Sequence, residues 1–353
     1  LAVASGKRHA LMTGSGTSAI YTALLVSDIP KGSYVAVPNI SCPDPVYALI
    51  WAGYKPYFID VNEDNYNVDV AHLECVAEKG MIKAVIAIHL FGNPCEIDTI
   101  QNICKKHTLF LLEDCAQALG NQYKGIPLGS FGDVSIFSFG NGKIIEVGHG
   151  GSLQTNNLEL YTRAVNAQSD LPCFNEANHS SRSGSHRTLY YKLFNGALIF
   201  PSIEIFNRIF LNFYKDYYLF QFHERYRSKI SIEMKRLSAN RKSRIRIAKR
   251  FLEALSRISN IVLPRLYDEN NALSRLTIYV NNSEKKSARI RDIGIPSNTM
   301  YPPLVGRFQL LFNAMKLQRS LESRGQLLNL WTNEMSDQDV EKVIQLLTKN
   351  NHV

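Results

Sequence analysis

Residues 8–155 alternate short apolar runs with segments of helical periodicity. The clearest runs are rich in β-branched and aromatic residues: 34–38 (YVAVP), 57–61 (YFIDV), 83–89 (KAVIAIH), 108–114 (TLFLLED) and 134–139 (VSIFSF). Between them lie helical patterns such as 96–107, which places Ile97, Ile100 and Ile103 on one face. Continuous apolar strands separated by helices predict a mainly parallel sheet that is covered on both faces. Ligands of such sheets bind at the carboxyl ends of the strands.

The pattern changes in the second half of the chain. Residues 156–188 are polar, and residues 189–222 are strongly aromatic. The longest uncharged run in the aromatic segment is eleven residues, which is short of the roughly 20 that a membrane-spanning helix needs. Residues 230–257 predict a basic amphipathic helix, and the remainder predicts a smaller α+β domain with a final helix after Asp337. We therefore expect a large domain at 1–229 and a second unit at 230–353 that contains the linking helix and the small domain.

Composition narrows the class of protein. The chain has 353 residues, of which 45% are hydrophobic, so it can bury a large core. Its net charge of +9 is concentrated in part at 242–250 and 285–291, where basic and apolar residues alternate at helical spacing. That spacing favours exposed helix faces over a nucleic-acid surface, so we expect no nucleic-acid partner.

The cysteines and the start of the chain bear on the compartment. The six cysteines form no CxxC pair and no regular spacing, which argues against a metal site or a disulfide framework and for a reducing compartment. No signal peptide opens the sequence. We expect a cytoplasmic protein and leave open a peripheral attachment to the inner face of the membrane.

The segment 13–25 (TGSGTSAIYTALL) predicts a glycine turn that opens a helix. The free N–H groups and the positive dipole end of such a helix form an anion site that suits a phosphate. Gly14, Gly16 and Ala19 also match the GxGxxA nucleotide fingerprint, but the next strand ends in VAVPNIS, without the acid that a dinucleotide fold requires. The segment therefore remains compatible with a cofactor that carries a phosphate but is not a dinucleotide.

Glu113 and Asp114 stand at the end of an apolar strand. A carboxylate there is costly to desolvate unless it has a cationic partner or hydrogen bonds. Two interpretations of Asp114 stay open. It is either the N-cap of a helix that follows the strand, or the partner of a protonated heterocyclic nitrogen such as a pyridinium.

Lys143 lies in a glycine-rich stretch that follows another apolar strand. A solvated loop lysine is the ordinary interpretation of such a residue. A helix N-terminus for a phosphate, an aspartate for a pyridinium and a lysine for an aldehyde together describe pyridoxal 5′-phosphate held as a Schiff base. Ser138, five residues before the lysine, can add a hydroxyl to the same phosphate.

Several stretches within 13–157 match one family in order. They are GSGTSA, VPNISCPDPVYALIWAGYKPYFIDV, HLFGNPCEID, LLEDCAQALGNQYKGIPLGSFGDVSIFSFGNGK and GHGGSLQTN. The chain resembles the DegT/StrS-type sugar aminotransferases, which belong to the aspartate aminotransferase superfamily of fold type I. The resemblance implies a large α/β domain with a mainly parallel seven-stranded sheet flanked by helices, a smaller C-terminal α+β domain and a homodimer.

The resemblance also assigns roles to single residues. It makes Lys143 the Schiff-base lysine, Asp114 the partner of the pyridine nitrogen and Gln117 the donor to the phenolic oxygen of the ring. It makes Thr17, Ser18 and Ser138 the phosphate ligands, and it puts Cys42 where the family usually has an aromatic residue over the ring. Besides Cys42, His149 departs from the family's GEGG, and the family's Asn-Tyr-Arg loop has no clean match.

The resemblance implies an aminotransferase that uses pyridoxal 5′-phosphate to convert a nucleotide-linked keto sugar into an amino sugar, with glutamate as the amino donor. Family members that dehydrate the sugar carry a histidine where Lys143 stands, so the lysine favours transamination. The alternatives are a dehydratase-like enzyme and a non-catalytic protein that binds the cofactor. The aromatic segment 189–222 resembles an insertion. We favour a second subunit as its cover, with an anionic membrane surface as the other option.

Overall fold

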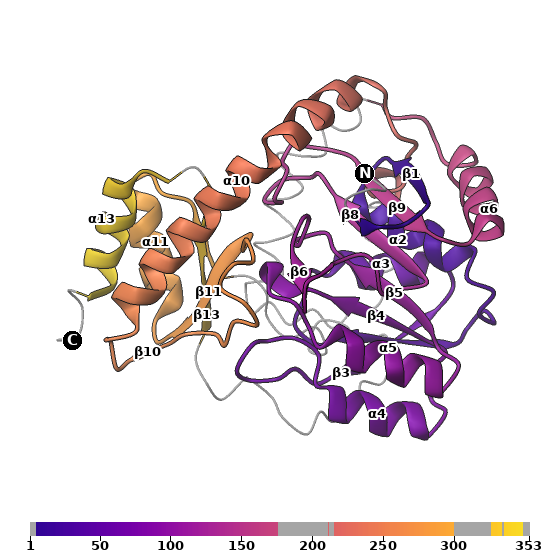
Figure 1. Ribbon diagram of the computed structural model, residues 1–353, viewed down its shortest axis with the longest axis horizontal. Coiled ribbons are helices and arrows are strands. Elements are labelled where there is room, and N and C mark those ends of the chain that lie inside the picture. The colour runs from indigo at the N-terminus through magenta and orange to yellow at the C-terminus, as the bar shows by residue number, and fades with distance from the viewer. Residues whose placement is uncertain (1–4, 176–210, 212–214, 300–325, 334, 349–353) are drawn as a thin grey trace, which may run out of the picture.

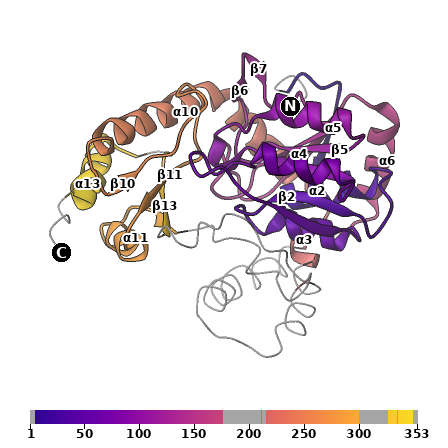
Figure 2. The same ribbon diagram turned by 90° about the horizontal axis from the view of Figure 1, so that it is seen from below.

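The computed structural model describes residues 5–175, 211, 215–299, 326–333 and 335–348. These residues form a large lobe and a small lobe, and the long helix α10 (Arg225–Leu255) runs from one to the other (Figure 1). Seen from below, the two lobes lie side by side (Figure 2). None of the helices in the described part of the chain is long and apolar enough to cross a membrane.

A seven-stranded sheet forms the centre of the large lobe, in the order β1-β9-β8-β5-β4-β2-β3. Only β9 runs against its neighbours, because β8 and β1 both pair with it in antiparallel fashion and the remaining pairs are parallel. The prediction of a mainly parallel seven-stranded sheet is confirmed. Its strands are β1 (His9–Thr13), β2 (Tyr34–Pro38), β3 (Lys55–Ile59), β4 (Ala84–Ile88), β5 (Phe110–Asp114), β8 (Val134–Ser138) and β9 (Gly151–Thr155).

Helices cover both faces of this sheet, as its apolar strands require. One apolar core joins the sheet to α2 (Gly16–Leu25), α3 (Asp44–Trp51) and α6 (Leu158–Ser169). A second core joins it to α4 (Val70–Glu78), α5 (Ile97–Lys106) and the start of α10. Successive side chains of a strand point to opposite faces, so Leu112 enters the first core and Leu111 the second. By the same alternation Asp114 faces the α2 side and Glu113 the α5 side.

The small lobe is an antiparallel sheet packed against helices. Its strand order is β10-β11-β13-β12, and a third apolar core fills the space between this sheet, α10 and two further helices. The elements are β10 (Ile261–Val262), β11 (Arg275–Val280), α11 (Ser283–Asp292), β12 (Ser297–Asn298), β13 (Gln326–Trp331) and α13 (Asp337–Thr348). The hairpin β6 (Gln122–Tyr123) and β7 (Ile126–Pro127) and the short 3-10 helix η1 (Leu90–Gly92) complete the described elements.

Helix α10 begins at Arg225, before the expected start at 230, because Tyr226 and Ile230 already bury their side chains against the large lobe. The expected boundary between 229 and 230 therefore falls inside a helix, and the division into two domains there stays a prediction. The final helix α13 begins at Asp337, next to the predicted position.

The end of the aromatic segment lies across the start of α2. The hydroxyls of Ser15 and Ser18 both donate to the carbonyl oxygen of Tyr218, each at 2.7 Å. Phe220 packs so closely on Gly14 that a Cβ there would lie 2.2 Å from the Phe220 carbonyl oxygen. Most of 189–222 lies outside the described residues, so both proposed covers for that segment remain predictions.

Replacing Gly14 with Ala tests this close packing. The added methyl group must displace the Phe220 backbone, and overpacking of this kind costs about 2 kcal/mol of unfolding free energy. Urea denaturation of Gly14→Ala and Gly140→Ala measures the effect. A Cβ at Gly140 meets its nearest neighbour at an ordinary 3.6 Å, so Gly140→Ala is the matched control. Equal stability of the two variants would contradict the placement of Phe220.

Candidate functional site

The carboxyl ends of β5 and β8 meet the start of α2 at one edge of the large sheet. The two strands are parallel neighbours, with Asp114 opposite Ile136. Ser138 follows two residues later at the end of β8 and touches the helix start, since a Cβ on Gly16 would lie 2.8 Å from the Ser138 Cβ. Asp114 and Ser138 therefore lie near a helix N-terminus, where backbone N–H groups favour an anion.

The glycine-rich loop that carries Lys143 is folded against the large lobe. The Phe139 N–H donates to the Gly150 carbonyl oxygen, and the Val147 N–H donates to the Phe139 carbonyl oxygen, both at 2.9 Å. Ile144 and Ile145 are buried, whereas the Lys143 side chain is half-buried. The lysine is thus part of an anchored loop and differs from an ordinary solvated one.

Lys143 forms one electrostatic group with Asp114 and Cys42. Burial raises the pKa of Asp114, while the N–H of Ala116 and the charge of Lys143 act to lower it. Burial also raises the pKa of the Cys42 thiol, which Lys143 again opposes. A buried carboxyl group with a raised pKa gains from a cationic partner, because the partner stabilises its charged form.

The helix N-cap interpretation of Asp114 is correct for the hydrogen bond and wrong for the helix. Its Oδ1 accepts the N–H of Ala116 at 2.9 Å, as an Asx turn requires. The described chain then continues in turns as far as β6, and no helix begins there. The residue shapes a turn at the carboxyl edge of the sheet.

Sequence reasoning missed Asp44, the first residue of α3. Its side chain hydrogen-bonds with those of Cys42 and Tyr218 and interacts with Lys143, while burial raises its pKa. The available signal was its position in SCPDP, two residues after Cys42 and just beyond the end of a predicted strand. The site therefore holds a second carboxyl group beside the lysine.

The remaining predicted ligands lie around the same edge. Gln117 is buried, and its Oε1 accepts the Ser274 hydroxyl at 3.1 Å, which leaves its amide nitrogen as the donor. Thr17 and Ser18 lie in the first turn of α2, where Ser15 is the N-cap and accepts the Ser18 N–H at 2.9 Å. A phosphate bound to Ser18 would replace the Tyr218 carbonyl as acceptor of its hydroxyl.

His149, a departure from the family pattern, lies in an aromatic cluster. Its ring centroid is 5.4 Å from that of Phe174 and 5.4 Å from that of Tyr226. Burial, with a contribution from the charge of Arg225, lowers the pKa of His149. The imidazole therefore acts as a neutral packing group that supports the loop after Lys143.

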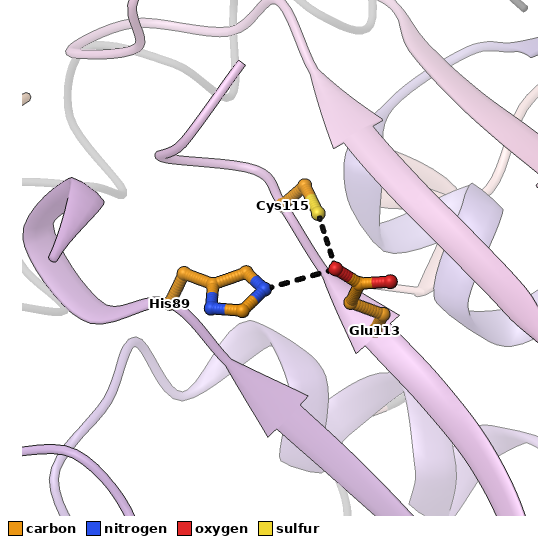
Figure 3. Close-up of side chains that lie close together, drawn as sticks. All are labelled: His89, Glu113 and Cys115. Atoms are coloured by element: carbon orange, nitrogen blue, oxygen red, sulfur yellow. Dashed lines mark hydrogen bonds and ion pairs between the residues drawn. The ribbon is translucent and has the colours of Figure 1, made fainter. Parts of the chain in front are cut away.

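On the opposite face of the sheet, Glu113 lies with His89 and Cys115 in a fully buried cluster (Figure 3). The His89 Nε2 is 3.1 Å from Glu113 Oε1, and the Cys115 thiol donates to the same oxygen at 3.7 Å. His89 Nδ1 accepts the N–H of Cys95 at 3.2 Å, which leaves Nε2 as the ring nitrogen that donates to Glu113.

These three side chains have the donor types of a metal site, but the acceptor positions of Glu113 and of His89 Nδ1 are already used. Glu113 accepts the backbone N–H groups of Gly129, Phe131 and Gly132 at 2.6, 2.9 and 2.9 Å. Burial by itself would raise the pKa of Glu113, yet these bonds and His89 outweigh it and lower the pKa. The cluster is a structural clamp that holds the loop leading into β8.

Known proteins that are similar to this chain identify its family. A model of the DegT/DnrJ/EryC1/StrS aminotransferase family matches residues 1–187. The chain belongs to this family. A GDP-perosamine synthase of Escherichia coli O157:H7 is 37% identical over 159 residues, which are 45% of this chain and 43% of the relative. The chain thus spans less than half the length of that curated relative.

Solved structures share the fold of this chain. S. venezuelae DesV in complex with a ketimine intermediate gives a TM-score of 0.79 at 21% identity, covering 100% of this chain and 87% of that one. Bacillus subtilis NtdA with bound cofactor PMP gives 0.72 at 21% identity, covering 99% and 74%. At this level of identity the likeness supports the fold alone.

Replacing Glu113 with Gln tests the clamp. The amide places an N–H₂ group among backbone donors and removes a buried charge from its partners, which costs about 3 kcal/mol of unfolding free energy. Denaturant titration of the wild type and Glu113→Gln at pH 7 measures this difference.

The pH dependence of that difference has a fixed sign. The folded-state pKa of Glu113 is lowered, so its stabilisation is complete above the unfolded value of about 4.3 and is lost as the pH falls towards the folded value. The difference in unfolding free energy between wild type and Glu113→Gln should therefore be complete at pH 7 and decrease below about pH 4.3. A gap that is constant with pH would contradict an ionised Glu113.

Proposed function

We propose that this protein is a pyridoxal 5′-phosphate-dependent aminotransferase that converts a nucleotide-linked keto sugar into an amino sugar, with glutamate as donor. The observation that carries the proposal is the electrostatic grouping of Lys143 with Asp114 at the sheet edge where the end of β8 meets the start of α2. Family membership supports the reaction class. The name of the E. coli relative supports a nucleotide-linked sugar, and the PMP bound to NtdA supports the cofactor.

The residues at the sheet edge fit this cofactor in charge and donor type. Thr17, Ser18 and Ser138 would hold the phosphate at the start of α2. The buried carboxyl group of Asp114 would accept the protonated ring nitrogen, Gln117 would donate to the phenolic oxygen, and Cys42 would contact the ring face. When bound, pyridoxal 5′-phosphate supplies an electron sink for the carbon that loses a proton.

The chain's own residues account for proton movement and orientation. Among the described residues, the half-buried Lys143 amine is the basic group placed to take a proton from the donor carbon and return it, as a general base and acid. Its charge interacts with the carboxyl groups of Asp44 and Asp114, which would favour an amine directed towards the ring. Asp44 adds a hydrogen-bonding carboxyl group that faces the same space and suits a polar substrate.

Lys143→Ala is the central test. Purified wild type should bind pyridoxal 5′-phosphate with visible absorbance, form a borohydride-trapped adduct at Lys143 and show a spectral change on addition of glutamate. The variant should lose the adduct and turnover of nucleotide-linked keto sugars, while its unfolding free energy changes by no more than about 0.5 kcal/mol.

Lys79→Ala removes an exposed lysine at the end of α4 and is the control. An adduct at another lysine, or normal turnover by Lys143→Ala, would refute the assignment. A wild-type adduct that ignores glutamate and every keto sugar in the panel would favour a non-catalytic cofactor-binding protein.

Asp114→Asn separates the two adjacent carboxyl groups. A neutral amide cannot hold the ring nitrogen protonated, so this variant should bind the cofactor, stay folded and lose at least about 99% of turnover. Glu113→Gln, one residue away on the opposite face, should show the reverse pattern of lost stability and retained cofactor chemistry in the folded fraction. Near-normal turnover by Asp114→Asn would contradict this role and leave Asp114 only as a residue that forms a turn.

A further inference from the structure

Arg244 is a buried cation in the middle of α10, with only 3% of its surface exposed. Its Nε donates to the Asn240 side-chain oxygen at 2.7 Å, and its Nη1 reaches the Ser274 carbonyl oxygen at 3.4 Å and the Thr332 hydroxyl at 3.3 Å. Its Nη2 donates to the carbonyl oxygen of Lys143 at 3.1 Å. One guanidinium thus joins the linking helix, the small lobe and the loop of the proposed catalytic lysine.

The chemistry of the guanidinium suits this position. A buried charge is tolerated only where hydrogen bonds replace the lost water, and the flat fork of arginine can satisfy several acceptors at fixed angles. A lysine at the same place has a single nitrogen and cannot span the same set. The identity of residue 244 therefore bears on the geometry of all the segments that it joins.

The hydrogen bond from Arg244 to the Lys143 carbonyl matters because the glycine next to this lysine allows the backbone many conformations. Gly142 has φ of +74°, which favours glycine. Its N–H is held by the Glu146 carboxylate at 2.9 Å, and the Lys143 carbonyl is held by Arg244. Arg244 therefore restrains the peptide group that follows the Lys143 Cα, and Glu146 restrains the one that precedes Gly142. Together they limit the direction in which the lysine side chain leaves the backbone.

The same contacts extend to Gln117. The Ser274 carbonyl accepts from Arg244, and the Ser274 hydroxyl donates to the Gln117 oxygen at 3.1 Å. The Thr332 hydroxyl that accepts from Arg244 also donates to the Leu273 carbonyl at 2.6 Å. The small lobe is thereby connected to two of the residues assigned to the cofactor site.

We propose that Arg244 is a positioning residue for Lys143, which fixes the lysine backbone relative to the small lobe and to Gln117. This inference rests on the proposed function for the role of Lys143. The restraint on the loop is a property of the chain itself and is measurable without cofactor.

The test compares wild type with Arg244→Gln, Arg244→Lys and the control Arg236→Gln. Arg236 is on the same helix, with its side chain 70% exposed and paired with Glu233, so its loss should change little. Two quantities are measured: amide hydrogen exchange of 140–147 in cofactor-free protein, and the rate at which added pyridoxal 5′-phosphate becomes borohydride-trapped at Lys143.

Arg244→Gln should speed exchange in 140–147 without affecting β4 and β5, and should slow trapping about tenfold, the effect of one lost hydrogen bond to a charged group. Arg244→Lys should fall between Arg244→Gln and wild type. If Arg244→Gln does not fold, Arg244→Lys decides: slower trapping with faster exchange supports the inference, and wild-type values overturn it. Faster exchange with an unchanged trapping rate also overturns it, because Arg244 would then restrain the loop without affecting the reaction of Lys143 with the cofactor.

The experiment also separates this inference from the proposed function. A wild-type protein that forms no adduct at Lys143 refutes the proposed function. In that case the exchange rates alone decide whether Arg244 holds the loop.

Discussion

Burial of the Glu113 carboxylate is the constraint on which the site depends. The side chain has no access to water, so its charge must be met by protein donors, and most of these are backbone N–H groups of 129–132. That loop leads directly into β8, whose register against β5 places Ile136 beside Asp114. The lysine loop starts where β8 ends. The buried charge of Glu113, on one face of the sheet, thus determines where the loop that carries Lys143 leaves the edge of the sheet.

Glu113 and Asp114 show how neighbouring carboxyl groups acquire different properties. They are consecutive residues of one strand and point to opposite faces. Glu113 is saturated by donors and has a lowered pKa, whereas Asp114 accepts one N–H and has a pKa raised by burial. Environments that separate two pKa values separate two roles. Glu113 stabilises the fold, and Asp114 keeps a raised pKa although the charge of Lys143 opposes it.

The sequence predicted the parallel strands of the sheet and the helices between them, and it named site residues whose roles stay predictions. Those features have local signals: apolar runs, a glycine turn before a helix, and polar residues at strand ends. Asp44 had only a weak signal of this kind, its position beyond a predicted strand, because its direction depends on how the chain turns at Pro43 after β2. Arg244 lacked a signal, since it is one of many basic residues in α10 and its partner Lys143 is 101 positions away. Which arginine is buried depends on how α10 lies on both lobes.

The division of the site between two lobes follows from these contacts. In the proposed function, the large sheet supplies Asp114, Lys143 and the start of α2 for a phosphate and a ring. The described residues of the small lobe supply acceptors for the guanidinium that anchors Lys143 and a hydroxyl that donates to Gln117. A shift of the small lobe against the sheet would move both anchors together. The position of the Lys143 amine, for which we propose proton transfer, is therefore set by how the lobes are joined as well as by the strand that precedes it.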